Sequence, residues 1–335
     1  MNALRLLHDE LAEAIPKDRP LIYLDYPRTK NIGDLLILLG TLEFFRRYKF
    51  NVRLSRMFDN TPPRSGLGVQ PGDTIILHGG GNFGDLYPHN HAYRERIIQE
   101  YPDHKILIFP QTAFYSDSEK LKRNADILNG HPDLTLYVRD RTSESLLRPY
   151  LGERVRLMPD MAHQLWPSLH HKAEARKKGE DAGPLILMRT DKEAGGSFAT
   201  LDAQKENFVD WDDVNYKSLS VWKRVFDKIA SIEGSRNMSL GAANLYFGVM
   251  QHEVEKVSRK LALHDVWITS RMHGGILGLL LNKRVFAVDN NYGKLSSYID
   301  TWFHSLENIE MISSEEDAER AFAFARQYRA TRDAE

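Results

Sequence analysis

Short apolar segments rich in β-branched and aromatic residues alternate with longer segments of helical periodicity in the first half of the chain. The short segments predict strands at residues 21–26, 51–56, 74–78, 105–109, 135–139 and 154–158. The longer segments between them predict helices at residues 35–48, 92–101, 118–129 and 143–151. This alternation is typical of parallel strands joined by helices that cover the sheet.

The same alternation restarts in the second half after a polar break. Residues 170–183 carry mixed charge and few apolar side chains, so we interpret them as an exposed linker. Beyond the linker, the pattern predicts strands at residues 184–190, 266–269 and 284–289, and helices near residues 221–232 and 243–263.

The pattern as a whole predicts an α/β fold of two Rossmann-like, doubly wound domains that face each other across a cleft. The N-terminal domain is expected to span residues 1–168 and the C-terminal domain residues 184–312. Such sheets bind ligands beyond the carboxyl ends of their strands, so the cleft is the expected site. Residues 313–335 predict a final helix, whose apolar stripe contains Ala321, Phe322, Phe324 and Ala325.

Composition narrows the classes of function. The 45 basic and 46 acidic side chains nearly cancel, so no global field recruits nucleic acid or an anionic membrane. The chain has no cysteine, which excludes disulfides, zinc–thiolate sites and a cysteine nucleophile and fits a reducing compartment. Acidic residues interrupt the apolar periodicity of the first twenty residues, so we expect an amphipathic helix of a cytoplasmic protein instead of a signal peptide.

Two glycine-containing turns follow predicted strands of the first domain. In the first turn, Gly33 permits a sharp change of direction and Asp34 can cap the apolar helix that follows, with Asn31 just before them. A purely structural capped helix and a ligand site are about equally compatible with this turn.

The second turn contains three consecutive glycines, residues 79–81, at the end of a buried strand. The missing side chains of Gly80 and Gly81 would let a ligand approach backbone amides, and Asn82 and Asp85 supply polar groups at the rim. The G-x-G-x-x-G spacing and the P-loop lysine are missing, so neither a dinucleotide site nor an ATP site follows.

Arginines stand where predicted strands end in both domains. Arg139 ends a strand of the first domain and can either face a ligand or pair with Asp140 or Asp160. Arg189 ends the first strand of the second domain in the same topological position.

The segment TSRMHGGILG, which begins at residue 269, joins a predicted strand to a predicted helix. Arg271 supplies a planar fork suited to a carboxylate or phosphate, and His273 supplies an imidazole that can act as an acid or a base. Gly274 opens the amide-rich start of the helix, where positive neighbours discourage protonation of the histidine. These features together predict an anion-binding cleft with an acid–base histidine.

The order and spacing of several motifs resemble the polysaccharide pyruvyl transferase family. The resemblance runs from about residue 31 to residue 298 and rests on NIGDLLILLG, HGGGNFGDLY, FPQT, VRDRTSESL, PDMAH, RTDKE and TSRMHGGILGLLLNKRVFAVDNNYGKLSSY. It implies an architecture like that of the two-domain glycosyltransferase-B enzymes, in which the C-terminal helix packs back near the N-terminal domain. It also implies transfer of a pyruvyl group from phosphoenolpyruvate to a sugar of a bacterial polymer, usually as a cyclic ketal.

The resemblance assigns roles to the candidate residues. Arg139, Arg189 and Arg271 are expected to bind the carboxylate and phosphate of the donor, because these anions suit planar guanidinium groups. His273 would donate a proton or stabilise the leaving phosphate, and the sequence does not choose between these roles. Asp34 or Asp85 would accept a proton from the sugar hydroxyl, with the acceptor on the N-terminal side of the cleft.

The implied partners follow from the same resemblance. They are phosphoenolpyruvate as donor substrate and a sugar or lipid-linked oligosaccharide as acceptor, with no separate cofactor and no nucleic acid. Peripheral association with membrane-bound polysaccharide assembly enzymes is also implied. No metal site is predicted, because the carboxylates are scattered singly and residues 210–213, with the sequence DWDD, are interpreted as a solvated loop.

Three other functions remain open at the level of sequence. A nucleotide-sugar glycosyltransferase would use the same type of cleft, and a non-catalytic glycan-binding or assembly subunit would keep the fold without releasing phosphate. A reductase-like role is disfavoured, because no cysteine or dinucleotide fingerprint is present. One departure from some family members is that Phe114 and Tyr115 stand where those members place a histidine, so Tyr115 is a candidate for its role.

Overall fold

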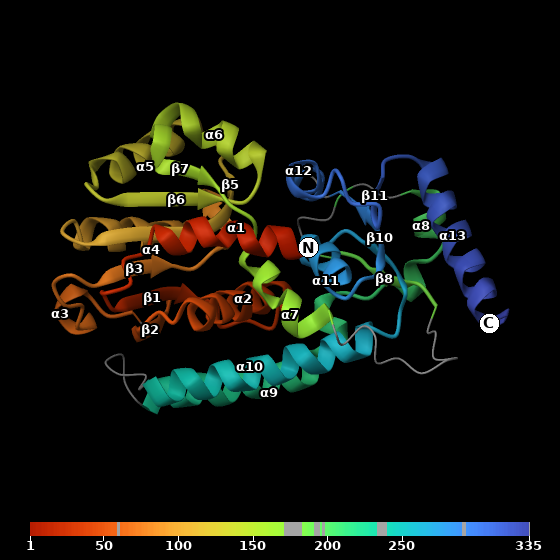
Figure 1. Ribbon diagram of the computed structural model, residues 1–335, viewed down its shortest axis with the longest axis horizontal. Helices are drawn as coiled ribbons and strands as arrows, with labels where there is room; N and C mark the ends of the chain where they lie inside the picture. The colour runs from red at the N-terminus through yellow and green to blue at the C-terminus, as the bar shows by residue number, and fades with distance from the viewer. Residues whose placement is uncertain are drawn as a thin grey trace.

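A computed structural model of the protein describes residues 1–58, 61–170, 183–190, 195, 198–232, 240–289 and 293–334 (Figure 1). Almost all of the predicted linker lies outside these residues.

The first sheet has the order β2-β1-β3-β5-β6-β7 with β4 added beside β5, and its pairings are parallel. Its strands are β1 (Leu21–Tyr26), β2 (Val52–Met57), β3 (Thr74–Leu77), β4 (Gly80–Gly84), β5 (Lys105–Phe114), β6 (Leu134–Val138) and β7 (Val155–Leu157).

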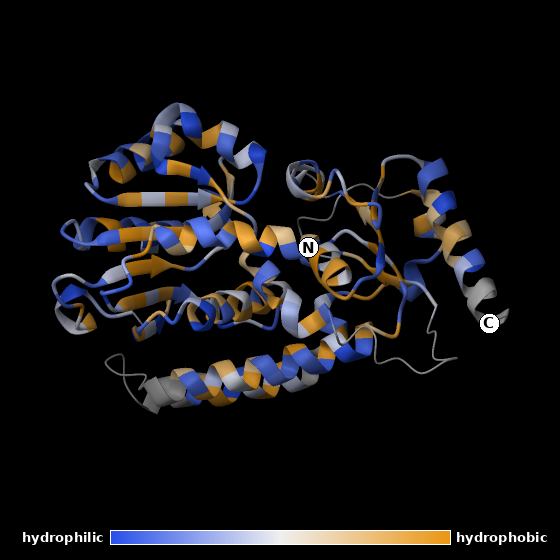
Figure 2. Cartoon of the chain, viewed as in Figure 1, coloured by the Kyte–Doolittle hydropathy of each residue, from blue (hydrophilic) through white to orange (hydrophobic). Residues whose placement is uncertain are grey.

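Both faces of this sheet are covered, because successive side chains of a strand point to opposite faces. Tyr23 of β1 belongs to the core beneath helix α2, whereas Ile22 and Leu24 belong to the core beneath α4, α5 and α6. The helices of this half are α1 (Asn2–Glu13), α2 (Ile32–Tyr48), α3 (Arg64–Leu67), α4 (Pro88–Glu100), α5 (Ser118–Gly130), α6 (Arg141–Leu151) and α7 (Trp166–Leu169). Figure 2 shows the resulting apolar strands between helices whose outer faces are polar.

The second sheet is smaller and has the order β11-β10-β9-β8, again with parallel pairings. Its strands are β8 (Leu185–Leu187), β9 (Val266–Thr269), β10 (Arg284–Val288) and β11 (Ile309–Ile312). Its helices are α8 (Ala199–Asp202), α9 (Trp211–Ile232), α10 (Leu240–Leu261), α11 (Met272–Leu280), α12 (Lys294–Trp302) and α13 (Glu315–Ala334). The α/β class and the parallel sheets are therefore confirmed, whereas the closer likeness to glycosyltransferase-B stays a prediction.

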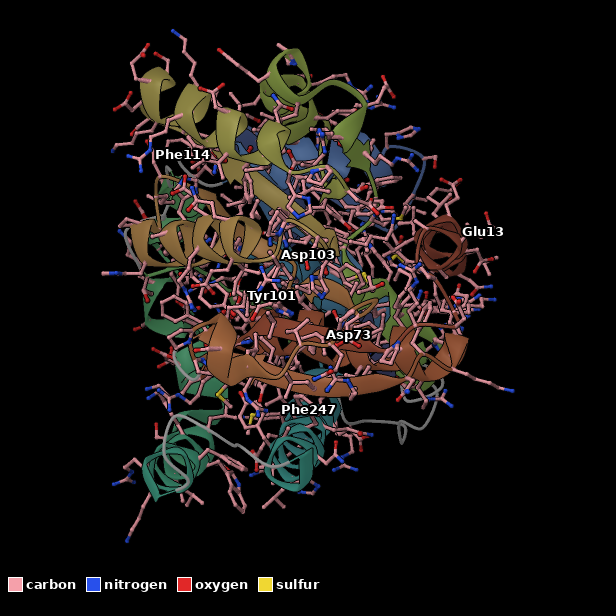
Figure 3. All side chains as sticks on the ribbon, turned by 90° about the vertical axis from the view of Figure 1, so that its left-hand side faces the viewer. Glu13, Asp73, Tyr101, Asp103, Phe114 and Phe247 are labelled. Atoms are coloured by element: carbon pink, nitrogen blue, oxygen red, sulfur yellow. The ribbon has the colours of Figure 1, made fainter. Side chains whose placement is uncertain are left out.

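Helices α9 and α10 leave the second sheet and run beneath the first one (Figure 1). Phe247 of α10 lies between that helix and the first sheet (Figure 3), with its ring centroid 5.1 Å from that of Tyr26. The hydroxyl of Tyr246 donates a hydrogen bond to the carbonyl of Pro27 at 2.7 Å. One apolar core consequently runs from α2 through α10 to the α11 face of the second sheet.

The C-terminal helix α13 does not pack where we expected. Its buried residues Ala318, Ala321 and Phe322 join the core on the outer face of the second sheet. That face carries apolar side chains from all four strands, and the single turn of α8 is too short to cover them. The described part of α13 therefore covers the second sheet instead of returning to the first half. No helix in the described residues is both long and apolar enough to cross a membrane.

Candidate functional site

The carboxyl ends of strands from both sheets meet at a cavity of about 360 Å³. Its walls include the segments after β1 and β3, between which the strand order of the first sheet changes direction, and the start of α11. Doubly wound sheets bind ligands at such switch points. The predicted site residues that line the cavity are Asn31, Asp34, Gly80, Gly81, Asn82, Arg139, Arg189, Arg271 and His273.

The imidazole of His273 crosses from α11 to the first half of the molecule. Its Nε2 lies 3.3 Å from Oδ2 of Asp160, which directly precedes the short 3-10 helix at Met161–Leu165. A Cβ atom on Gly33 would lie only 2.7 Å from Nδ1 of His273. Gly33 is therefore required to seat the histidine, and it is not itself part of the cavity lining.

Asp160 holds two predicted site residues in place. Its carboxylate is fully buried, and Oδ2 lies 2.6 Å from Nη1 of Arg139 as well as near His273. Burial alone would raise the pKa of Asp160, but the charges of His273 and Arg139 hold that pKa well below its usual range. The pairing with Arg139 is one of the sequence alternatives, whereas the contact with His273 depends on how the two halves dock.

Two cations converge on Gly81. A Cβ atom there would lie 2.6 Å from Nζ of Lys294 and 2.9 Å from Nη2 of Arg139, so the glycine leaves room for both. Arg139 is further fixed by a hydrogen bond from Nε to Oγ1 of Thr112 at 2.8 Å. Like charges this close repel, and an anion placed between them would be stabilised. Sequence analysis missed Lys294, although it stands at the start of a helix, where an anion could also bind.

Arg271 uses one edge of its guanidinium group on a protein carboxylate. Its Nε donates to Oδ1 of Asp210 at 2.7 Å and its Nη2 to Oδ2 at 2.5 Å. The interpretation of residues 210–213 as a solvated loop is therefore wrong at Asp210, which is 4% exposed. Burial would raise the pKa of Asp210, but Arg271 lowers it, so the pair stays ionised. The full fork that we expected to be available for the donor is already partly engaged.

Asp34 is placed to exchange a proton in the cavity. Asn31, and not Asp34, caps α2 by accepting a hydrogen bond from the amide of Gly33 at 2.8 Å. Burial raises the pKa of Asp34, although the charges of His273 and Lys294 oppose this shift. Asp160 and Asp34 are thus two carboxylates whose pKa values move in opposite directions, which is how acid–base roles become separated in a site.

Asp85 does not line the cavity. Its carboxylate accepts hydrogen bonds from the amide and Oγ of Ser116, at 3.0 and 2.8 Å, and from the amide of Asp117 at 3.2 Å. Burial would raise the pKa of Asp85, but these hydrogen bonds lower it below its usual value. The residue therefore fixes the loop between β5 and α5, and the structure does not bring it together with the other predicted site residues.

Two further expectations are corrected by packing. A Cβ atom on Gly274 would lie 2.4 Å from Oγ1 of Thr269, so this glycine lets α11 approach its sheet and does not line the cavity. The hydroxyl of Tyr115 donates to Oδ1 of Asn124 at 2.6 Å, outside the cavity lining, and it cannot replace a catalytic histidine there.

His78, at the end of β3, also lines the cavity and was not predicted. Its Nδ1 lies 2.5 Å from the hydroxyl of Tyr23, and burial lowers its pKa to about 3. The ring is therefore neutral near pH 7 and acts as a hydrogen-bonding group instead of a charge.

Positive charge dominates the cavity lining. Six cationic side chains face two carboxylates, Asp25 and Asp34, so the lining suits a ligand with more than one negative charge. The cationic residues are Arg28, Arg139, Arg189, Lys223, Arg271 and Lys294.

The fold and this lining define an α/β protein with a cationic ligand cavity between two parallel sheets. The chain belongs to the polysaccharide pyruvyl transferase family, whose sequence profile matches residues 31–292. It is therefore a member of a transferase family associated with pyruvyl transfer to polysaccharides.

Individual relatives agree with this membership. The chain is 34% identical over 303 residues to the "Putative pyruvyl transferase EpsO" of Bacillus subtilis, covering 90% of this chain and 91% of the relative. It is 29% identical over 243 residues to "Pyruvyl transferase 1" of Schizosaccharomyces pombe, covering 71% of this chain and 57% of the relative. A crystal structure of an uncharacterised Klebsiella pneumoniae protein resembles the fold with a TM-score of 0.63 at 20% identity, covering 94% of this chain and all of that one.

Proposed function

We propose that the protein transfers the pyruvyl group of phosphoenolpyruvate to two hydroxyl groups of one sugar and forms a cyclic ketal. The observation that carries this proposal is the convergence of Arg139 and Lys294 on Gly81, beside His273 and Asp34. Phosphoenolpyruvate carries a phosphate and a carboxylate on a three-carbon skeleton, so it matches a small cavity with several cations. A sugar of a polysaccharide or of its lipid-linked precursor is the corresponding acceptor.

The cations are proposed to bind the two anionic groups of the donor in two pairs. Arg139 and Lys294 bind one anionic group at Gly81, and Arg189 and Arg271 bind the other from the second half of the cavity. The contacts of Arg139 with Asp160 and of Arg271 with Asp210 support this division, because each carboxylate fixes its arginine before the donor arrives. A fixed cation loses little conformational entropy when an anion binds.

Proton transfer is proposed to use Asp34 and His273. A proton from one of these groups adds to C3 of phosphoenolpyruvate, which becomes a methyl group and leaves C2 electrophilic. One sugar hydroxyl forms a bond to C2 and loses its proton to the other group. The bond from C2 to the phosphate oxygen then breaks, the second hydroxyl closes the ring, and its proton leaves with phosphate or solvent.

Asp160 is proposed to position His273 without touching the donor. Its carboxylate lies 3.3 Å from Nε2, so Nδ1 is the nitrogen left for the reacting groups. The lowered pKa of Asp160 keeps the carboxylate ionised during the cycle. The two-domain likeness to glycosyltransferase-B is part of the same proposal, with the donor mainly in the second half and the acceptor in the first.

The test is incubation of the purified protein with phosphoenolpyruvate and a panel of methyl pyranosides and lipid-linked oligosaccharides. Acceptor-dependent phosphate release and a mass gain of one pyruvyl ketal on the sugar are expected. Parallel reactions with nucleotide sugars test the glycosyltransferase alternative. Glycan binding without phosphate release from phosphoenolpyruvate would favour a non-catalytic subunit and reject the proposal.

A further inference from the structure

A second wall of the cavity is built from neutral amides instead of cations. Arg94 of α4 lies behind it, with Nη2 located 2.6 Å from Oδ2 of Asp25 in a buried ion pair. The same arginine donates from Nη1 to the carbonyl of Asn82 at 3.0 Å and from Nη2 to Oδ1 of Asn82 at 2.7 Å. Burial raises the pKa of Asp25, and the charge of Arg94 and the side chain of Asn90 beside it oppose this shift.

These bonds leave one polar group on each asparagine for the cavity. Oδ1 of Asn82 is engaged by Arg94, so its Nδ2 remains as a donor. The side chain of Asn90 lies beside the carboxylate of Asp25, which attracts its Nδ2, so its Oδ1 remains as an acceptor. Both asparagines line the cavity and are half-buried, and the described contacts give these two atoms no other partner.

The backbone at Asp25 is held in an unusual conformation to build this wall. Its φ of 65° is left-handed, and the register of β1 with β2 shifts between Leu24 and Tyr26. A residue other than glycine rarely adopts this conformation unless the surrounding contacts enforce it, and such positions cluster at ligand sites. The shift places the carboxylate of Asp25 beside the cavity, where it holds Arg94 and Asn90.

His78 supplies a further group of the same kind. It is 5% exposed and lines the cavity, and its Nε2 has no hydrogen-bond partner within the described residues. A buried polar nitrogen without a partner is destabilising unless a ligand or water binds it. A hydroxyl group can both donate and accept a hydrogen bond, so it suits this nitrogen in either tautomer, whereas a carboxylate or phosphate suits only one.

We propose that Asn82 and Asn90 bind the hydroxyl groups of a neutral pyranose, with Arg94 and Asp25 as positioning residues. This wall carries a balanced ion pair and no net charge, unlike the cationic part of the lining, so it fits an uncharged polyol. The rings of Phe58 and Tyr87 also line this part of the cavity and offer apolar faces for the C–H groups of a sugar. The inference rests on the proposed function, because it assigns the acceptor half of the same site.

The experiment compares Asn82→Leu, Asn90→Leu and a matched control, Asn129→Leu. Asn129 is exposed and donates to the carbonyl of Tyr150 at 2.9 Å, away from the cavity, so its replacement removes an equivalent hydrogen bond. Binding of phosphoenolpyruvate is measured by calorimetry, and methyl pyranosides of gluco, galacto, manno and N-acetylglucosamine configuration are measured by saturation-transfer NMR. Each cavity variant is expected to weaken pyranoside binding about tenfold while phosphoenolpyruvate affinity and the control stay unchanged.

The outcomes separate this inference from the proposed function. A wild-type protein that binds phosphoenolpyruvate but none of the neutral pyranosides, or that prefers methyl glucuronide, would overturn the inference alone. Cavity variants that keep full pyranoside affinity, or that lose phosphoenolpyruvate affinity with an unchanged melting temperature, would also overturn it. Failure of the wild-type protein to bind or consume phosphoenolpyruvate would instead reject the proposed function.

Discussion

Each of the two walls of the cavity contains buried ion pairs, but the charge that stands behind the lining is negative in one wall and positive in the other. On the cationic wall, the buried carboxylates of Asp160 and Asp210 stand behind Arg139 and Arg271 and leave positive groups facing the cavity. On the amide wall, the cation Arg94 stands behind Asp25 and Asn82 and balances the charge of Asp25, so that the amides of Asn82 and Asn90 are the groups left for a ligand. A buried ion pair therefore does not reveal the chemistry of a site by itself. The side chains that line the cavity beside the pair decide whether the wall suits an anion or a polyol.

The largest expected effect comes from removing the imidazole that reaches across the cavity. His273→Ala should lower turnover about a hundredfold or more and change phosphoenolpyruvate affinity little, because an acid–base group works mainly in the transition state. Turnover, donor affinity and melting temperature are measured on the same preparation. A stable variant with full activity would remove His273 from the mechanism, and a loss of affinity alone would make it a donor-binding residue.

A smaller loss is expected from displacing the same ring. Gly33→Ala puts a methyl group 2.7 Å from the present position of Nδ1 of His273, so the ring must move and turnover should fall about tenfold. Gly40→Ala on the same helix is the contrast, because its methyl group would lie 2.0 Å from the backbone oxygen of Met161 and should prevent stable folding. Thermal unfolding and kinetics of both variants test the distinction. Unchanged kinetics in Gly33→Ala would show that the activity does not depend on the present position of the His273 ring.

Arg271→Lys tests the cationic wall without changing its charge. An ammonium group cannot keep the two hydrogen bonds to Asp210 and also face a ligand, so donor affinity should fall about tenfold. Calorimetry with phosphoenolpyruvate measures this loss, and pyranoside binding to the amide wall serves as the internal control. Equal loss of both ligands would indicate a general disturbance of the cavity instead of a specific role.

The smallest expected effect concerns pH and stability. Burial lowers the pKa to about 4 in His8 and to about 3 in His78 and His163. Unfolded histidine titrates near pH 6.5, so the unfolded chain binds more protons between that pH and the folded pKa values. Burial of these histidines in their neutral form stabilises the fold fully above about pH 6.5. Below that pH, the free energy of unfolding falls by about 1.4 kcal/mol per pH unit for each histidine.

Thermal unfolding between pH 7 and pH 5 measures this decline. The raised pKa values of Asp25 and Asp34 act in the opposite sense, because their folded carboxyl groups bind protons more readily than the unfolded ones. His8→Gln should give a shallower decline than the wild type, since it removes one titrating group that does not line the cavity. An unchanged slope would contradict the assignment.

Sequence reasoning located the cavity because the relevant residues stand at the ends of strands. Arg139, Arg271 and His273 each follow an apolar run, and parallel sheets bring such ends to one edge. Of the partners of these residues, only Asp160 as a partner of Arg139 was among the sequence alternatives. The contact of Asp160 with His273 depends on how the two halves dock, and Asp210 lies in an acidic segment whose sequence does not indicate that it holds Arg271.

The errors of prediction have a common physical cause. Asp85 looks like a rim residue of a glycine-rich turn, but its carboxylate accepts hydrogen bonds from three groups of the loop after β5. The C-terminal helix has an apolar stripe that could cover any exposed sheet face. The periodicity of that stripe does not indicate which face it covers. Helix α9 begins at Trp211, ten residues before the helical pattern was apparent, and Asp210 accepts a hydrogen bond from the amide of Trp211 at this start while also holding Arg271.

The long helix pair α9 and α10 affects how substrates reach the cavity. Because α10 is joined to the first half through Tyr246 and Phe247, the helix pair braces the two sheets against each other. A wide hinge opening would separate these contacts and expose the shared apolar core. We therefore expect substrates to enter through side-chain movements at the rim, so the bulk of a polymer stays outside while its reacting sugar enters.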